Sequence, residues 1–151
     1  MTSLLEASRL GQAKAVQAIC DSRRYPRQAA LRGELDSTAL HVACENGHEA
    51  VVRALLTKSH ALVNEANAHG KTPLHVACEH GSLGCALLLV EAGAGLNAAD
   101  VQGCTPLIRA CLAGDDGAVQ LLAECRAALD ATDGVGMSAL FRASVQGTPA
   151  A

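Results

Sequence analysis

Histidine and cysteine pairs are the residues of this sequence best suited to chemistry. His41 and Cys44 lie three residues apart, and His75 and Cys78 repeat the pair 34 residues later. Imidazole and thiolate are ligands that zinc binds well, but a tetrahedral site needs its ligands within about 2.3 Å of one centre. Because the pairs occupy equivalent positions of a repeated unit, we expect them to spread along a stack of repeats and not to converge on a metal ion.

No other pattern indicates catalysis. The chain has no GxxxxGK[ST] phosphate loop, no GxSxG nucleophile elbow and no HExxH metal motif. We therefore expect a protein that is not an enzyme and that holds no cofactor and no metal ion.

The unit that carries the histidines and cysteines recurs along the whole chain. Its best-formed copy is Gly70–Ala77, with the sequence GKTPLHVA, and further copies follow at intervals of 33 residues at Gly103–Ala110 and Gly136–Ala143. An upstream copy, Thr38–Ala43, lies 34 residues before the equivalent threonine. A period of about 33 residues with a T-P-L-H-x-A core is the signature of ankyrin repeats. The chain therefore resembles the ankyrin-repeat family.

The resemblance implies an all-α solenoid of about four and a half helix-turn-helix units joined by β-hairpin loops. Thr72 is suited to cap the first helix of its repeat, and Pro73 suits the first helical position. Gly81 and Gly93 are expected to end the two helices in left-handed conformation. In this family the equivalent of His75 bonds to the backbone between repeats. One ankyrin domain is expected over residues 1–151, with a capping repeat at 2–32, repeats at 33–67, 68–102 and 103–135, and a partial repeat at 136–151.

Composition favours thin stacked layers over one large core. Half of the 151 residues are apolar, yet there is one Phe, one Tyr and no Trp. The core must then consist of Leu, Val, Ala and Cys. No apolar run approaches the roughly 20 residues of a membrane span, and the N-terminus lacks a secretory signal. Cys44, Cys78 and Cys111 each follow the motif alanine. A ladder of buried thiols is typical of a reducing compartment, so we expect a soluble protein of the cytoplasm, the nucleus or both.

The charge of the chain is divided unevenly. Residues 1–33 hold six basic and two acidic groups, a net charge of +4, and the remaining six basic and thirteen acidic groups give −7. The acidic body argues against a nucleic-acid partner. A basic loop containing Arg23, Arg24 and Arg27 could dock an acidic or phosphorylated partner, with Tyr25 for stacking and Leu31 as an anchor. The alternative is a solvated surface loop.

The resemblance also implies where a partner would bind. Partners of ankyrin proteins mostly dock on the concave side, which hairpin tips and first helices form. The corresponding residues here are Glu45, His69, Lys71, Glu79, His80, Val101, Gln102, Cys104, Leu112, Val135 and Met137. The early positions are charged and most later ones are apolar, which predicts apolar anchors toward the C-terminus and charge complementarity toward the N-terminus. Alternatively, a further helix or a longer chain covers the apolar residues.

Asn97 is a candidate modification site. It lies in the exit segment Leu96–Asp100, where family members can be hydroxylated by an oxygen-dependent asparaginyl hydroxylase. The alternative is a turn asparagine that satisfies backbone groups.

These observations predict a monomeric, non-catalytic interaction module, an adaptor or scaffold that binds another protein and neither nucleic acid nor a membrane. Two alternatives stay open. Short ankyrin stacks can clamp cyclin-dependent kinases, so the chain could be a direct inhibitor of a protein kinase or another enzyme. Its His-Val-Ala-Cys units resemble the repeats of SOCS-box proteins, so it could be the substrate-recognition part of a ubiquitin ligase adaptor.

Overall fold

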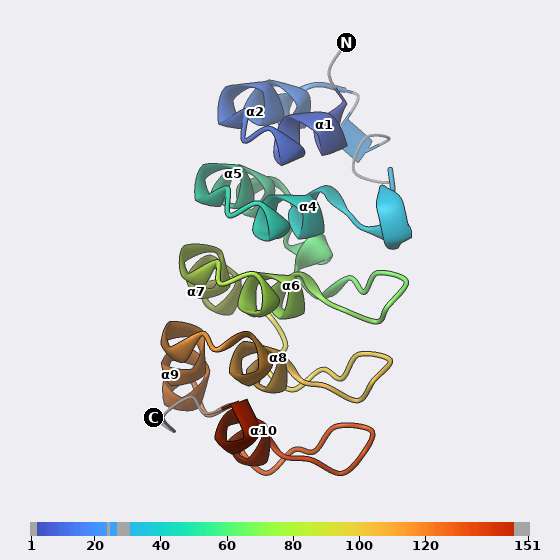
Figure 1. Ribbon diagram of the computed structural model, residues 1–151. Coiled ribbons are helices and arrows are strands. Elements are labelled where there is room, and N and C mark those ends of the chain that lie inside the picture. The colour runs from blue at the N-terminus through green and yellow to red at the C-terminus, as the bar shows by residue number, and fades with distance from the viewer. Residues whose placement is uncertain (1–2, 24, 27–30, 147–151) are drawn as a thin grey trace.

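The fold is a stack of helical pairs (Figure 1). The computed structural model describes residues 3–23, 25–26 and 31–146. Its helices are α1 (Leu4–Arg9), α2 (Ala13–Asp21), α4 (Ala39–Glu45), α5 (Glu49–Lys58), α6 (Pro73–Glu79), α7 (Leu83–Glu91), α8 (Pro106–Ala113), α9 (Asp116–Glu124) and α10 (Ala139–Gln146), with short 3-10 turns η1 (Glu34–Asp36) and η2 (His60–Asn64). The expected all-α solenoid of between four and five repeats is confirmed.

The helices form two layers. Figure 1 shows α1, α4, α6, α8 and α10 in one column, α2, α5, α7 and α9 in a second, and the connecting loops projecting from the side of the first column. The loops are tied as hairpins by backbone bonds, such as Asp100 N to Cys104 O at 3.0 Å. The equivalent bond joins Asp133 N to Met137 O at 2.9 Å. The loops and the first helices therefore share one face of the stack.

Each motif histidine helps to cap the N-terminus of its own helix and bonds to the next repeat. The His75 Nδ1 accepts the Thr72 N–H at 3.1 Å, and Thr72 caps α6 with Pro73 in the first turn. With Nδ1 an acceptor, the ring proton lies on Nε2, which donates to the Cys104 carbonyl at 2.9 Å. His41 repeats this arrangement and donates to the Lys71 carbonyl at 2.8 Å. The expected bond between repeats is confirmed, and both ring nitrogens of each histidine are engaged.

Left-handed residues end the helices as expected. Gly81 and Gly93 have φ angles of 68° and 86°. Arg126 occupies the position of Gly93 one repeat later and keeps a φ of 64°. A residue with a Cβ is strained in this region by about 1 kcal/mol.

The strain at Arg126 leads to a stability prediction. Arg126→Gly is expected to raise the free energy of unfolding by up to about 1 kcal/mol, because glycine accepts the left-handed backbone without a steric penalty. The matched control is Gly93→Ala, where a Cβ would meet nothing within 4 Å. That variant should lose a similar amount through strain alone. Urea denaturation measures both changes, and an unchanged stability in both variants would remove the argument.

The core is built from leucine columns and small residues. Leu40, Leu74 and Leu107 of the first helices are at most 1 % exposed. Cys44 and Cys78 are completely buried beside them, and all seven cysteines are free. Burial raises the pKa of Cys78 to about 12, so this thiol stays protonated and acts as a small hydrophobic residue.

Among the described residues, no helix is both long enough and apolar enough to cross a bilayer.

Candidate functional site

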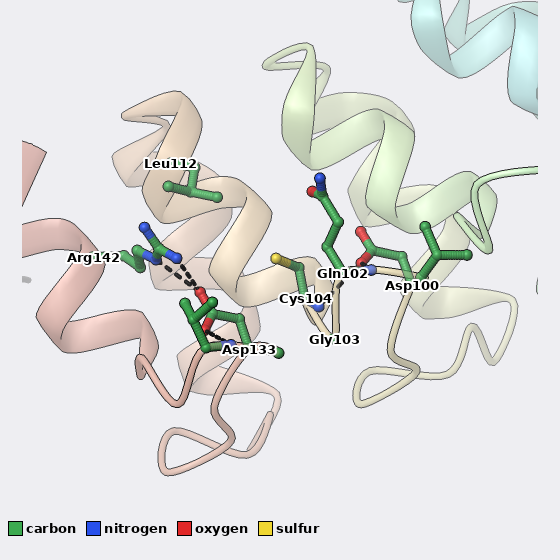
Figure 2. A pocket seen from close by; sticks show the side chains of 10 residues that line it. Asp100, Gln102, Gly103, Cys104, Leu112, Asp133 and Arg142 are labelled. Carbon is green, nitrogen blue, oxygen red and sulfur yellow. Dashed lines mark hydrogen bonds and ion pairs between the residues drawn. The ribbon is translucent and has the colours of Figure 1, made fainter.

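A groove of about 750 Å³ opens between the hairpins of the fourth and fifth repeats. Figure 2 shows Arg142 of α10 and Leu112 of α8 near Asp133, with Gln102 and Cys104 of the preceding hairpin across from them. The full lining consists of Asp100, Val101, Gln102, Gly103, Cys104, Leu112, Asp133, Gly134, Val135 and Arg142. The groove therefore lies on the face shared by the loops and the first helices.

The structure brings several sequence-predicted residues together in this groove: Val101, Gln102, Cys104, Leu112 and Val135. Val101 and Val135 are 70 % and 72 % exposed, whereas Leu112 and Met137 are half-buried. The expected exposure of Cys104 is wrong. Its N–H is bonded to Asp100 and its carbonyl accepts from His75, so the residue is held inside the stack and its side chain is buried.

Two buried aspartates shape the walls of the groove. Asp100 Oδ1 accepts the N–H groups of Gln102 and Cys104 at 2.9 and 3.0 Å, which fastens the hairpin. Its Oδ2 accepts from Arg109 Nε at 2.8 Å. Asp133 repeats the arrangement and accepts from Arg142 Nε at 2.8 Å.

The third repeat holds its hairpin with an uncharged version of the same hydrogen-bond arrangement. Asn67 Oδ1 accepts the N–H groups of His69 and Lys71 at 3.0 and 3.1 Å, and Val76 stands where the later repeats have arginine. Sequence reasoning missed the aspartate–arginine pairs. The signal was present, because aspartate replaces asparagine only in the repeats where arginine replaces valine nine residues later.

Both carboxylates are held in the ionised form. Burial raises the pKa of Asp100, but Arg109 and the two backbone N–H donors outweigh it and bring the pKa below its ordinary value. The N–H of Met137 lowers the pKa of Asp133, burial opposes this, and Arg142 lowers it further. With their oxygens occupied, these carboxylates are not free to act as acids or bases.

Buried histidines give the stack a pH dependence near neutrality. Burial lowers the pKa of His41 and His75, although the carbonyl bonds oppose it. The unfolded chain then binds more protons below the ordinary histidine pKa of about 6.5. Stability is therefore complete above about pH 6.5 and falls as the pH drops through the lower folded pKa values.

We expect the free energy of unfolding to fall as the pH drops below about 6.5. His75→Ile should flatten this dependence, because isoleucine occupies the same position in the fourth repeat as Ile108 and is fully buried there. Urea titrations across the pH range measure both slopes. Stability that is flat with pH in the unaltered chain, or an unchanged slope in the variant, would contradict the assignment.

The charged and histidine residues of the predicted binding surface lie outside the groove lining. Lys71 Nζ and Glu79 Oε2 pair with each other at 2.5 Å, so their charges offset. His80 Nδ1 donates to the Val76 carbonyl at 3.0 Å, and His69 is exposed. Glu45 lines a separate depression of about 340 Å³ between the first two repeats. The binding roles of these residues stay predictions.

The basic loop is described only in part. Arg23 is exposed, while Arg24 and Arg27 lie outside the described residues. Tyr25 packs partly buried against the core. Leu31 is exposed, so the expectation that it anchors the loop is wrong.

Asn97 links two repeats. Its Oδ1 accepts the N–H of Ala128 at 2.7 Å, as Asn64 Oδ1 accepts the N–H of Gly95 at 2.7 Å. This satisfies backbone groups, as the turn alternative expects. Hydroxylation of the exposed Asn97 stays a prediction.

The motif histidines and cysteines do not gather into a metal site. Within the described residues, no group of three His, Cys, Asp or Glu side chains could hold a metal ion.

Comparison with family models agrees with the repeat geometry. A model of three ankyrin repeats matches residues 4–100, and a single ankyrin repeat matches residues 102–134. The protein therefore belongs to the ankyrin-repeat family, whose repeats are protein–protein interaction modules. No curated protein matches the chain significantly.

Proposed function

We propose that this protein is a non-catalytic adaptor that binds a partner protein through the groove between its fourth and fifth repeats. The observation that carries the proposal is the exposure of Val101 and Val135 at the hairpin tips beside this groove. Apolar side chains gathered on an otherwise polar surface are typical of protein-binding sites. Leu112 adds a half-buried apolar contact from α8.

The polar groups of the groove support binding over catalysis. Asp100 and Asp133 are buried and engaged by backbone N–H groups and arginines. Burial raises the pKa of the Cys104 thiol, which disfavours the nucleophilic thiolate. The groove therefore offers mainly apolar contact area to a partner.

The test compares two charge insertions in folded protein. Val101→Asp/Val135→Asp places carboxylates at the hairpin tips, and Leu87→Asp places one on the exposed surface of α7, outside the groove lining. We expect proteins cross-linked to the unaltered chain to be retained by Leu87→Asp and lost from the double variant. Equal retention by both variants, identified by mass spectrometry, would exclude the groove as the binding site.

The captured partner also separates the adaptor from the inhibitor. An adaptor leaves the activity of an enzyme partner unchanged at saturation, whereas an inhibitor lowers it. A ligase-recognition role would instead be supported by a captured protein whose ubiquitination depends on this chain.

We also propose that the protein acts in a reducing compartment, the cytoplasm or the nucleus. Seven free thiols, most of them buried, support this location.

A further inference from the structure

Arg142 differs from its counterpart Arg109 in how its hydrogen-bond donors are used. Arg109 binds Asp100 through Nε and Nη2, and its Nη2 also donates to Gln102 Oε1 at 2.7 Å. Its side chain is only 12 % exposed. In the next repeat Val135 replaces Gln102, so the Arg142 guanidinium has no such amide and donates, among the described residues, to Asp133 alone. The Arg142 side chain is 28 % exposed.

Apolar side chains share the groove with Arg142. Leu112 and Val135 line the same groove, and Val101 lines it from the preceding hairpin. The two carboxylates that line the groove are buried, and their oxygens accept bonds from backbone N–H groups and arginines. The Arg142 guanidinium is therefore the charged group of the lining that a bound partner can reach.

An arginine in this position selects a carboxylate. A guanidinium presents its N–H groups in a planar fork that matches the two oxygens of Asp or Glu. Nη1 of Arg142 has no bond to a described residue and is available for such a contact. The surrounding side chains favour apolar neighbours on the ligand, because they would otherwise stay exposed to water.

We propose that the groove binds an extended segment of a partner protein in which an Asp or Glu side chain is flanked by apolar residues. The carboxylate pairs with Arg142, and the flanking side chains contact Val101, Leu112 and Val135. This inference rests on the proposed function, because it names the class of segment that the same groove accepts.

The probe is a random peptide library displayed with its C-terminus fused to a phage coat protein, so that the ligand offers only side-chain carboxylates near the groove. We expect peptides selected on the full chain to contain Asp or Glu next to Leu, Ile, Val, Phe or Met. Enriched peptides without an acidic residue would overturn the inference but leave the groove intact as a protein-binding site.

The matched variant removes the guanidinium without leaving its carboxylate unpaired. Asp133→Asn/Arg142→Val copies the third repeat, where Asn67 holds the equivalent hairpin and Val76 stands in place of the arginine. We expect it to bind the best synthetic peptide at least about tenfold more weakly than the unaltered chain, the loss of one charge-assisted contact. When the Asp or Glu of the peptide is changed to Asn or Gln, the unaltered chain and the double variant should bind that peptide with the same affinity.

The control is Asp21→Asn/Lys58→Gln, which removes an ion pair between α2 and α5, outside the groove lining. It should change peptide affinity by less than about threefold. An acidic peptide that binds the Asp133→Asn/Arg142→Val variant as tightly as the unaltered chain would overturn the carboxylate contact.

Failure of the proposed function has a different signature. Selected peptides that bind Val101→Asp/Val135→Asp unchanged would remove the groove itself, and both proposals with it. The library could instead give no enriched peptide while Val101→Asp/Val135→Asp loses a partner in the capture experiment. That result would overturn the proposal of an extended acidic segment and leave the groove as a protein-binding site.

Discussion

Asp100→Asn is expected to lower the free energy of unfolding by about 3 kcal/mol, as for a nearly buried ion pair that loses one partner. Asp100 is buried and Arg109 is 12 % exposed. The amide keeps the Oδ1 acceptor for the hairpin N–H groups, but its NH₂ then faces the guanidinium. Two donors meet, and the charge of Arg109 is left without its counter-ion.

The second half of this prediction is a rescue. Adding Arg109→Val restores the Asn–Val combination of the third repeat, Asn67 with Val76, where the hairpin is held without an ion pair. The double variant should recover most of the lost stability. Urea denaturation of the unaltered chain, both single variants and the double variant measures the coupling between the two sites. Simple addition of the two single losses would contradict the ion-pair account.

Gly103→Ala is expected to separate the last two hairpins. Gly103 has a φ of 74°, and a Cβ there would lie 2.5 Å from the backbone nitrogen of Gly134. That nitrogen donates to the Gln102 carbonyl at 2.8 Å, so neither backbone segment can move without loss of the bond between hairpins. We expect the free energy of unfolding to fall by more than about 2 kcal/mol, because left-handed strain and this clash add together.

Gly136→Ala is the control for the backbone conformation. Gly136 has a φ of 81°, but a Cβ there meets nothing within 4 Å. Its loss should be about 1 kcal/mol, the strain alone. Gly70→Ala should fall between the two, since its nearest backbone neighbour, Val101 N, is 3.0 Å away. If urea denaturation shows the same loss of unfolding free energy for all three variants, the contact between hairpins does not explain the effect of Gly103→Ala. Because Gly103 lines the groove, its variant should also bind partners more weakly than Gly136→Ala does.

The candidate surface was only partly predictable from the sequence. The exposure of Val101 and Val135 follows from their place at hairpin tips, which the repeat register assigns. The burial of Cys104 does not, because it depends on how the hairpin residue sits against the preceding repeat. The same holds for the ion pair between Lys71 and Glu79, which forms only when the folded hairpin lies beside the end of α6.

Local chemistry repeated at a regular period was enough to determine the repeat architecture. Thr72 and Pro73 begin a helix, and Gly81 and Gly93 end helices, through contacts within a few residues of the chain. The groove and its charge were decided by the tertiary structure. Asp133 and Arg142 meet across nine residues, and the partly exposed guanidinium lines the groove where Val135 replaces the amide that Gln102 provides in the preceding repeat. Spacing along the chain determines which helices form, but the free hydrogen-bond donors of a side chain depend on every neighbour that the folded stack brings to it.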